Sequence, residues 1–141
     1  MPAGEPLPLE ALRAALPAAS LQGEADAVFS GVAYDSRVVA PGELFAALRG
    51  GYVDGHDFAS MAVERGAAAL LVERALPLAA PQLIVPDARA ALAVVAAEFY
   101  RHPSRQLDVI GITGTDGKTT TAYLTDAIFR AAGRATGMIG T

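Results

Sequence analysis

The sequence predicts an α/β fold in two parts. A small mixed α/β domain is expected over residues 1–103, and the first strand-helix (βα) unit of a phosphate-loop (P-loop) domain over residues 104–141. Two observations support this. Short apolar runs typical of buried strands alternate with helix-like segments as far as Tyr100. A further apolar run, Leu107 to Thr113, leads directly into a glycine-rich turn, and the residues from His102 to Gln106 are expected to form a hinge.

Elements of the first fifty residues are predicted from apolar spacing and turn residues. A first helix is expected to end before Pro17, and the two strands that follow flank a link rich in turn residues. That link contains Asp35-Ser36-Arg37 and Pro41-Gly42, and it could present polar side chains. The predicted bounds are residues 9–16 for the helix, and residues 28–34 and 43–48 for the strands.

The elements that follow are bounded by helix caps and stops. A helix is expected to end at Gly66, and Asp87 is placed to cap a longer helix that stops before Pro103. Loops are expected around Gly50-Gly51 and Asp54-Gly55. The predicted helices cover residues 58–65 and 88–100, and the predicted strands residues 68–72, 83–85 and 107–113.

Composition limits the classes of partner and compartment. Eleven basic against fifteen acidic residues give a net charge of −4, without a basic cluster interleaved with aromatic residues, so nucleic acid is not an expected partner. The chain has no cysteine, and its histidines, His56 and His102, lie far apart, which argues against a metal site built from such side chains. No leader and no run of ~18 apolar residues is seen, so a cytoplasmic protein without membrane contact is expected.

The stretch VIGITGTDGKTTT, residues 109–121, contains the residues that predict phosphate binding. Gly114 and Gly117 allow a tight turn that gathers backbone N–H groups, a helix start adds its positive dipole end, and Lys118 adds a mobile charge. Thr119 can offer its hydroxyl to Mg²⁺. The strict P-loop pattern requires glycine where Ile112 stands, so it is matched in part. The alternative is a junction without a ligand, which would not need a lysine followed by threonines.

The position of this motif indicates how much of a P-loop domain the sequence contains. A P-loop domain needs further parallel strands and more than ~100 residues, whereas 21 residues follow Thr120. We therefore expect the N-terminal part of a longer protein. By itself this part is expected to be inactive in catalysis.

Two segments together resemble the Mur ligase family. TGTDGKTTT, preceded by FYRHPSRQLDVIGI and followed by GMIGT, is similar to the start of the central ATPase domain, whose usual form is TGTNGKTTT. YDSRVVAPGELFAALRGGYVDGHDFASMAVERGAAALLVE resembles the N-terminal domain, where a DSR turn and a DG-H-F loop surround the UDP portion of the substrate. Thr115, HPSR and GMIGT are closer to the members that add the third residue of the peptide stem of peptidoglycan. Members that add D-Ala-D-Ala usually carry Ser in place of Thr115.

The resemblance implies an ATP-dependent amide ligase. It would act on UDP-N-acetylmuramoyl-L-alanyl-D-glutamate through an acyl phosphate, and an amino acid would displace the phosphate. Lys118 and Thr119 would be catalytic, with Thr119 on Mg²⁺, and the role of Asp116, where Asn is commoner, is open. The residues implied to bind ATP are Gly114, Thr115, Asp116, Gly117, Lys118, Thr119 and Thr120. Those implied to bind the UDP substrate are Tyr34, Ser36, Gly51, Tyr52 and Val53.

Other interpretations stay open from the sequence. Asp35 and Ser36 could simply cap a turn, with Arg37 as a surface charge. His56 is expected either near the substrate or packed on the domain. The whole protein could be a D-Ala-D-Ala-adding ligase, a folylpolyglutamate synthase, a module that only binds a UDP-sugar peptide, or a non-catalytic P-loop protein. The added amino acid and the oligomeric state are not readable from these residues.

Overall fold

The computed structural model describes residues 5–140, which form two compact units divided between Pro103 and Ser104. The predicted α/β class is confirmed, because the first unit contains a mainly parallel sheet with helices on both faces. Each unit is described separately. No helix among residues 5–140 has the length and apolar character required to cross a membrane.

A five-stranded sheet organises the first unit, in the order β2-β7-β6-β5-β4. Its four parallel strands run side by side in sequence order, and one antiparallel strand closes the edge next to β7. The parallel strands are β4 (Val32–Ala33), β5 (Leu44–Ala46), β6 (Ala69–Val72) and β7 (Gln82–Ile84), and the antiparallel one is β2 (Ser20–Gln22). A separate pair joins β1 (Leu7–Pro8) to β3 (Val28–Phe29).

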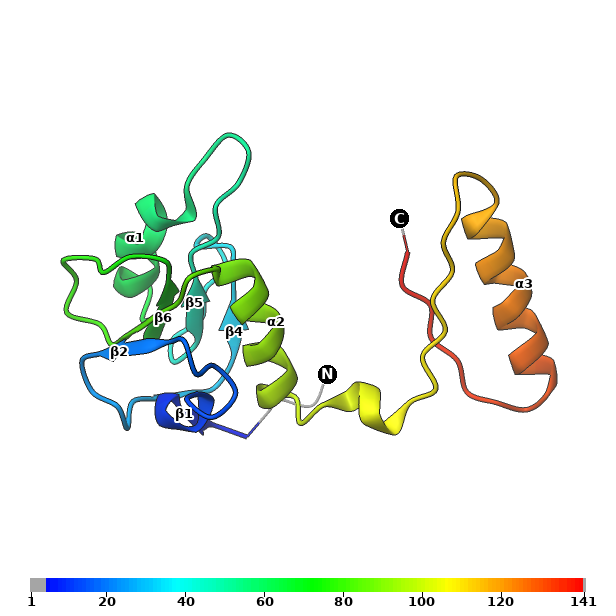
Figure 1. Ribbon diagram of the computed structural model, residues 1–141, viewed down its shortest axis with the longest axis horizontal. Coiled ribbons are helices and arrows are strands. Elements are labelled where there is room, and N and C mark those ends of the chain that lie inside the picture. The colour runs from blue at the N-terminus through cyan, green and yellow to red at the C-terminus, as the bar shows by residue number, and fades with distance from the viewer. Residues whose placement is uncertain (1–4, 141) are drawn as a thin grey trace. The chain divides into compact units, whose positions relative to one another are not determined.

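Alternate residues of the central strands fill two cores. Leu44 and Leu71 face one core, whereas Phe45 and Leu70 face the other, as the two-residue period of a strand requires. Helix α2 (Ala88–Phe99) covers the first face and helix α1 (Ala59–Glu64) covers the second, so the helices lie on opposite sides of the sheet (Figure 1). Burial on both faces explains why these strands read as continuous apolar runs.

Several predicted elements are confirmed, with bounds that are slightly shorter or, for β7, shifted by one residue. The strands expected over residues 43–48, 68–72 and 83–85 correspond to β5, β6 and β7, and the two predicted helices correspond to α1 and α2. Asp87 caps α2 as expected, because its Oδ1 accepts hydrogen bonds from the N–H groups of Arg89 and Ala90, both at 2.9 Å.

Two expectations for the first forty residues are corrected, and two short strands were not predicted. The helix expected over residues 9–16 is a single 3₁₀ turn, η1 (Leu9–Leu12). The strand expected over residues 28–34 is two strands in different sheets, because the Ser30 N–H donates to Gly42 O and the chain changes partner there. Strands β1 and β2 were not predicted, since their two or three residues carry no alternating apolar pattern.

The second unit is built around helix α3 (Lys118–Ala131), which follows the 3₁₀ helix η3 (Pro103–Gln106) and an irregular segment. Asp126 on α3 accepts a hydrogen bond from Thr136 Oγ1 at 2.6 Å and pairs with Arg130 Nε at 2.8 Å. These contacts, with the Thr136 hydrogen bond foremost, lower the pKa of the Asp126 carboxyl. The Thr136 hydrogen bond attaches the segment after α3 to the helix, whereas the Arg130 pair lies within α3.

One expectation for the second unit is wrong in the described residues. The segment 107–113 forms no strand; Leu107, Val109 and Ile110 are exposed, and Ile112 is half-buried. A strand needs a hydrogen-bonded neighbour, and residues 104–140 supply none to this segment. Helix α3 also has no buried residue, and Tyr123 on it is 61% exposed.

The cap of α2 gives a test of local stability. We expect Asp87→Ala to lower the free energy of unfolding by about 1 kcal/mol, because two N–H groups of the first turn lose their acceptor. Urea denaturation followed by circular dichroism measures this change. Asp26→Ala, in an exposed turn, is the matched control and is expected to shift stability by less than about 0.5 kcal/mol. Equal losses in the two variants would contradict the capping role.

Candidate functional site

The carboxyl ends of the four parallel strands meet at one edge of the sheet in the first unit. The turn at residues 34–37 follows β4, the loop at residues 47–54 follows β5, and Glu73-Arg74 follows β6. Asp87 follows β7 after two apolar residues. In open α/β sheets, ligands bind outside this edge. Both segments predicted to contact the UDP substrate therefore leave neighbouring strands at the edge expected for a ligand.

The turn after β4 is held by its own charged residues. The Arg37 guanidinium makes two hydrogen bonds to the Asp35 carboxylate, at 2.9 and 2.7 Å, and the Arg37 N–H donates to Asp35 Oδ1 at 3.0 Å. The Arg37 side chain and backbone thereby lower the pKa of Asp35 to about 2. The interpretation of Asp35 as a turn cap is confirmed. Of the predicted ligand-contacting residues here, Ser36 is buried and Tyr34 is 70% exposed.

A shallow hollow lies beside this turn. It has a volume of about 310 Å³, and Tyr34 and Asp35 border it together with Val32 and Val38. Two carboxylates border the hollow: Asp35 is paired with Arg37, and Glu43 accepts a hydrogen bond from the Ala40 N–H at 2.9 Å. The hollow therefore offers an exposed aromatic ring beside one ion pair and a second carboxylate, that of Glu43.

The loop after β5 closes into a short hairpin that we call the 49–54 hairpin. Arg49 and Asp54 form an antiparallel bridge, and the Gly50 N–H donates to Val53 O at 2.9 Å. The tip carries the other three residues predicted to bind substrate, and their side chains or backbone face solvent: Gly51, Tyr52 and Val53. In Figure 1 the loop between β5 and α1 stands out from the domain. Tyr52 is fully exposed, so its ring is available to a ligand.

Side chains from two strand ends fix the base of this hairpin. His56 is buried; its Nδ1 lies 2.5 Å from Asp54 Oδ1, and its Nε2 accepts from the Glu73 N–H at 2.9 Å. Asp54 also accepts from the His56 N–H and from the Arg74 guanidinium, each at 3.0 Å. The hydrogen bonds from His56, backbone first, and the one from Arg74 hold the pKa of Asp54 well below its ordinary value of 3.8.

Sequence reasoning did not find three members of this base: Arg49, Glu73 and Arg74. Arg49 Nε lies 3.0 Å from Glu73 Oε2, so the loop after β5 is paired directly with the end of β6. The available signal was position, because charged residues directly after a buried parallel strand lie at the ligand-binding edge. His56 was expected near the substrate or packed on the domain, and the structure places it inside the domain beneath the hairpin.

The glycine-rich loop of the second unit turns directly into α3. Gly117 has φ +73°, in the left-handed region, and it is the residue from which α3 starts. The Lys118 ammonium donates to Gly114 O at 2.7 Å and to Thr115 O at 3.2 Å, so the side chain is folded over the loop. All seven residues predicted to bind ATP, residues 114–120, are exposed.

The free donors of this loop fit a phosphate group. Among the described residues, the N–H groups of Thr115, Asp116 and Gly117 have no protein acceptor, and those of residues 118–120 precede the first intrahelical bond. The Thr119 hydroxyl lies in the first turn of α3, where a helix carries partial positive charge. The donor set therefore suits an anion, and the hydroxyl suits a hard cation such as Mg²⁺.

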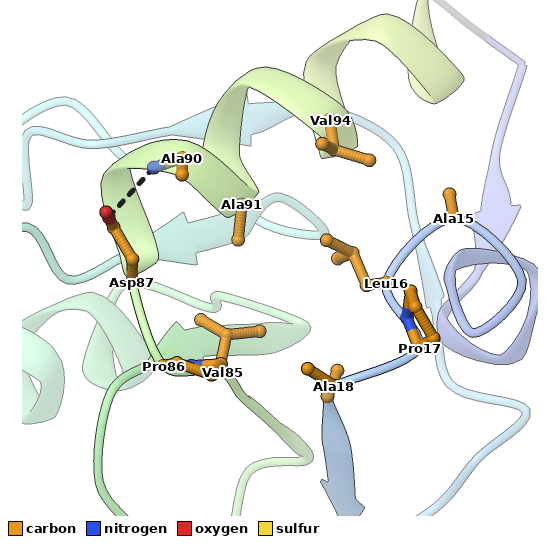
Figure 2. A pocket seen from close by; sticks show the side chains of 11 residues that line it. Ala15, Leu16, Pro17, Ala18, Val85, Pro86, Asp87, Ala90, Ala91 and Val94 are labelled. Carbon is orange, nitrogen blue, oxygen red and sulfur yellow. Dashed lines mark hydrogen bonds between the residues drawn. The ribbon is translucent and has the colours of Figure 1, made fainter.

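A separate hollow of about 250 Å³ lies where α2 begins (Figure 2). Its lining is almost wholly apolar and includes Leu16, Val85, Ala91 and Val94, and the polar Asp87 at its rim is engaged in capping Ala90. None of the residues predicted to bind a ligand lines it.

A family model and individual relatives both match this chain, and they indicate the same family. Residues 28–100 match the family described as "Mur ligase family, catalytic domain", and the P-loop lies outside that match. The chain is 51% identical over 107 residues to a UDP-N-acetylmuramoyl-L-alanyl-D-glutamate–2,6-diaminopimelate ligase of Geobacillus thermodenitrificans, covering 76% of this chain and 22% of the relative. It is 47% identical over 131 residues to a UDP-N-acetylmuramyl-tripeptide synthetase of Deinococcus radiodurans, covering 89% and 26%. The chain thus spans about a quarter of the length of these relatives.

Solved structures show the same fold. A MurF structure from Acinetobacter baumannii superposes with a TM-score of 0.74 and 32% identity, covering 91% of this chain and 28% of that one. A structure of a UDP-N-acetylmuramoyl-L-alanyl-D-glutamate–2,6-diaminopimelate ligase gives a TM-score of 0.64 and 26% identity, covering 84% and 25%.

Close backbone approach beneath the hairpin gives a stability test. A Cβ added at Gly55 would lie 2.5 Å from Leu48 O and 2.6 Å from Leu48 N, so the backbone would have to move. We expect Gly55→Ala to lower the free energy of unfolding by about 1–3 kcal/mol. Gly51→Ala is the control, because a Cβ there meets nothing within 4 Å. The test is urea denaturation, and equal stability of the two variants would show that the approach is not tight.

The Asp54 carboxylate makes stability depend on pH. Its pKa is lowered on folding, so its contribution is present above the unfolded value of 3.8 and is lost as pH falls below that value toward the folded pKa. We expect the stability difference between the wild type and Asp54→Asn to be largest above about pH 5 and to shrink below about pH 4. Urea titrations at several pH values measure it. A difference that stays constant from pH 7 to pH 3 would contradict a charged, hydrogen-bonded Asp54.

Proposed function

Because this chain belongs to the Mur ligase family, we propose that its protein is the ATP-dependent ligase that adds the third amino acid of the peptidoglycan stem. The substrate would be UDP-N-acetylmuramoyl-L-alanyl-D-glutamate. In this reaction ATP supplies the phosphoryl group that activates the terminal carboxylate as an acyl phosphate. Relatives at 44–52% identity carry names for this step, which supports the choice.

The glycine-rich loop is proposed to hold the triphosphate. The N–H groups of residues 115–120 would donate to phosphate oxygens, and Lys118 would exchange its contacts with Gly114 O and Thr115 O for a phosphate oxygen. Thr119 would ligate Mg²⁺. Asp116 is exposed in the same loop, where a carboxylate disfavours phosphate unless it faces away or toward the cation. The observation that carries this proposal is the Lys118 ammonium folded over a loop whose N–H groups are unpaired.

The first unit is proposed to bind the UDP end of the substrate at the carboxyl edge of its sheet. Tyr34 and Ser36 would contact it from the turn after β4, and Gly51, Tyr52 and Val53 from the hairpin tip. Support comes from the shared edge of β4 and β5 and from the exposed rings of Tyr34 and Tyr52. Neither segment carries an unpaired acidic side chain toward a diphosphate, since Asp35 and Asp54 are both engaged by arginine.

A ligase that adds D-Ala-D-Ala is the second candidate, and the observation in its favour is the higher TM-score to MurF. Identity is lower there, 32% against 51% for the Geobacillus relative, and Thr115 stands where such ligases usually have Ser. The incoming substrate separates the candidates. The third-residue ligase condenses the UDP-dipeptide with an amino acid, whereas the other requires a UDP-tripeptide and D-Ala-D-Ala.

A chimera tests this function. The corresponding N-terminal segment of the Geobacillus thermodenitrificans ligase is replaced by these 141 residues, and phosphate release is measured with UDP-dipeptide, ATP and diaminopimelate. We expect turnover in the chimera and a loss of at least about a hundredfold in kcat/KM for ATP on Lys118→Ala, because developing charge on the phosphoryl group loses its cation.

Arg105→Ala is the matched control, since it removes an exposed basic side chain upstream of the loop. Its kcat/KM is expected to equal that of the unmodified chimera. Full activity after Lys118→Ala would overturn the assignment of the loop. Activity with UDP-tripeptide and D-Ala-D-Ala would favour the second candidate.

A further inference from the structure

We propose that His56 is a positioning residue that locks the 49–54 hairpin onto the end of β6 and so presets its tip for the uridine nucleotide. The inference rests on the proposed role of Gly51, Tyr52 and Val53 in binding the UDP end of the substrate. It assigns a task to a buried side chain that touches no ligand. Three observations support it. The hydrogen bonds of His56 fix one tautomer of its ring, the ring contacts the end of β6 at Glu73, and Glu73 also pairs with Arg49 on the other side of the hairpin base.

The hydrogen bonds of His56 define its protonation state. Its Nε2 lies 2.9 Å from the Glu73 N–H, which is a permanent donor, so Nε2 must be an acceptor without a proton. The remaining proton is then on Nδ1 and is donated to Asp54 Oδ1. A neutral imidazole of this one tautomer satisfies both partners at once. The ring itself is buried, so its removal would leave the Glu73 N–H without its acceptor, whereas the partly exposed Asp54 would keep its hydrogen bonds from the His56 N–H and from Arg74.

The two hydrogen bonds of the ring join residues at different separations in the sequence. The Asp54 contact is local, because donor and acceptor are two residues apart. The Glu73 contact joins residues seventeen apart and ties the end of the hairpin to the end of β6. The second contact is therefore the one that positions the hairpin relative to the sheet.

Glu73 extends this attachment to the neighbouring elements. Its carboxylate accepts from the N–H of Ala88, the first residue of α2, at 3.1 Å and pairs with Arg49 at the opposite side of the hairpin base. The Arg89 guanidinium donates to Arg49 O at 3.1 Å. Both strands of the hairpin base are thus bound to Glu73, one through Arg49 and the other through His56. The tip, which has the Gly50–Val53 hydrogen bond to shape it, projects from a base fixed on both sides.

Two variants of similar size separate the contacts. His56→Asn retains an amide donor at the Nδ1 position and loses the acceptor for Glu73. His56→Gln carries an acceptor at the Nε2 position and loses the donor to Asp54. Amide hydrogen exchange by NMR on the 141-residue chain reads the hairpin directly. With His56→Asn we expect exchange at the Glu73 and Gly50 amides to speed up about tenfold relative to the β6 amides, and with His56→Gln less than about threefold.

The consequence for the ligand is measured by calorimetric titration of the same chains with UDP. We expect His56→Asn to weaken the Kd for UDP about tenfold and His56→Gln to restore it to within about threefold of the wild type. Gln82→Met is the matched control. Gln82 is buried on β7, and its side-chain amide bonds to the backbone of Leu76 and Leu78, away from the hairpin. This variant is expected to lower stability and leave the Kd unchanged.

Each result decides a separate point. Unchanged exchange in His56→Asn would overturn the attachment. Faster exchange with an unchanged Kd would overturn the link to binding, and so would an equal loss of affinity in Gln82→Met, which would indicate global destabilisation. If the wild type bound no UDP, the proposed function of the first unit would fail, while the exchange data would still decide whether His56 holds the hairpin.

Discussion

The parallel register of β4 to β7 is the constraint on which the first unit depends. Leu44, Ala69 and Gln82 begin three adjacent strands that run in the same direction as β4, so these four strands end at one edge. The segments that leave this edge are the DSR turn, the 49–54 hairpin and the Glu73-Arg74 pair. They are distant in sequence and become neighbours because strands in a sheet lie about 4.8 Å apart. Burial of both faces by α1 and α2 fixes that register, since a slip of one residue would exchange the two cores.

The carboxylates of Asp35, Asp54 and Glu73 at this edge are each paired with an arginine. Asp35 and Asp54 are held ionised by arginine and by N–H groups, with their pKa values lowered. Glu73 is shared between Arg49 and the start of α2. The residues at the tip of the 49–54 hairpin, by contrast, are glycine, tyrosine and valine. A surface of this kind suits a ring and a backbone-contacted diphosphate better than it suits a metal ion or a basic polymer.

The second unit follows a different principle, because its ligand groups come from one continuous segment. Gly117 in the left-handed region, the helix that starts at Lys118 and the folded lysine side chain are all specified within five residues. Such a site needs no long-range packing to place its donors, only a helix start. The segment before the loop, in contrast, depends on long-range pairing. Residues 107–113 have the composition of a strand, but they form no β-ladder because residues 104–140 provide no neighbouring strand.

The sequence by itself determined the α/β class, the cap at Asp87, the bounds of α2 and the glycine turn at residues 114–117 that leads into a helix. Each of these depends on neighbours within about five residues, where propensity, capping and glycine geometry act. Tertiary structure alone decided that residues 28–34 divide between two sheets and that β2 joins the edge. It also decided that His56 is buried against Asp54 and Glu73 rather than exposed to a ligand. These outcomes depend on which distant backbone groups come within hydrogen-bonding distance, and no local pattern encodes that choice.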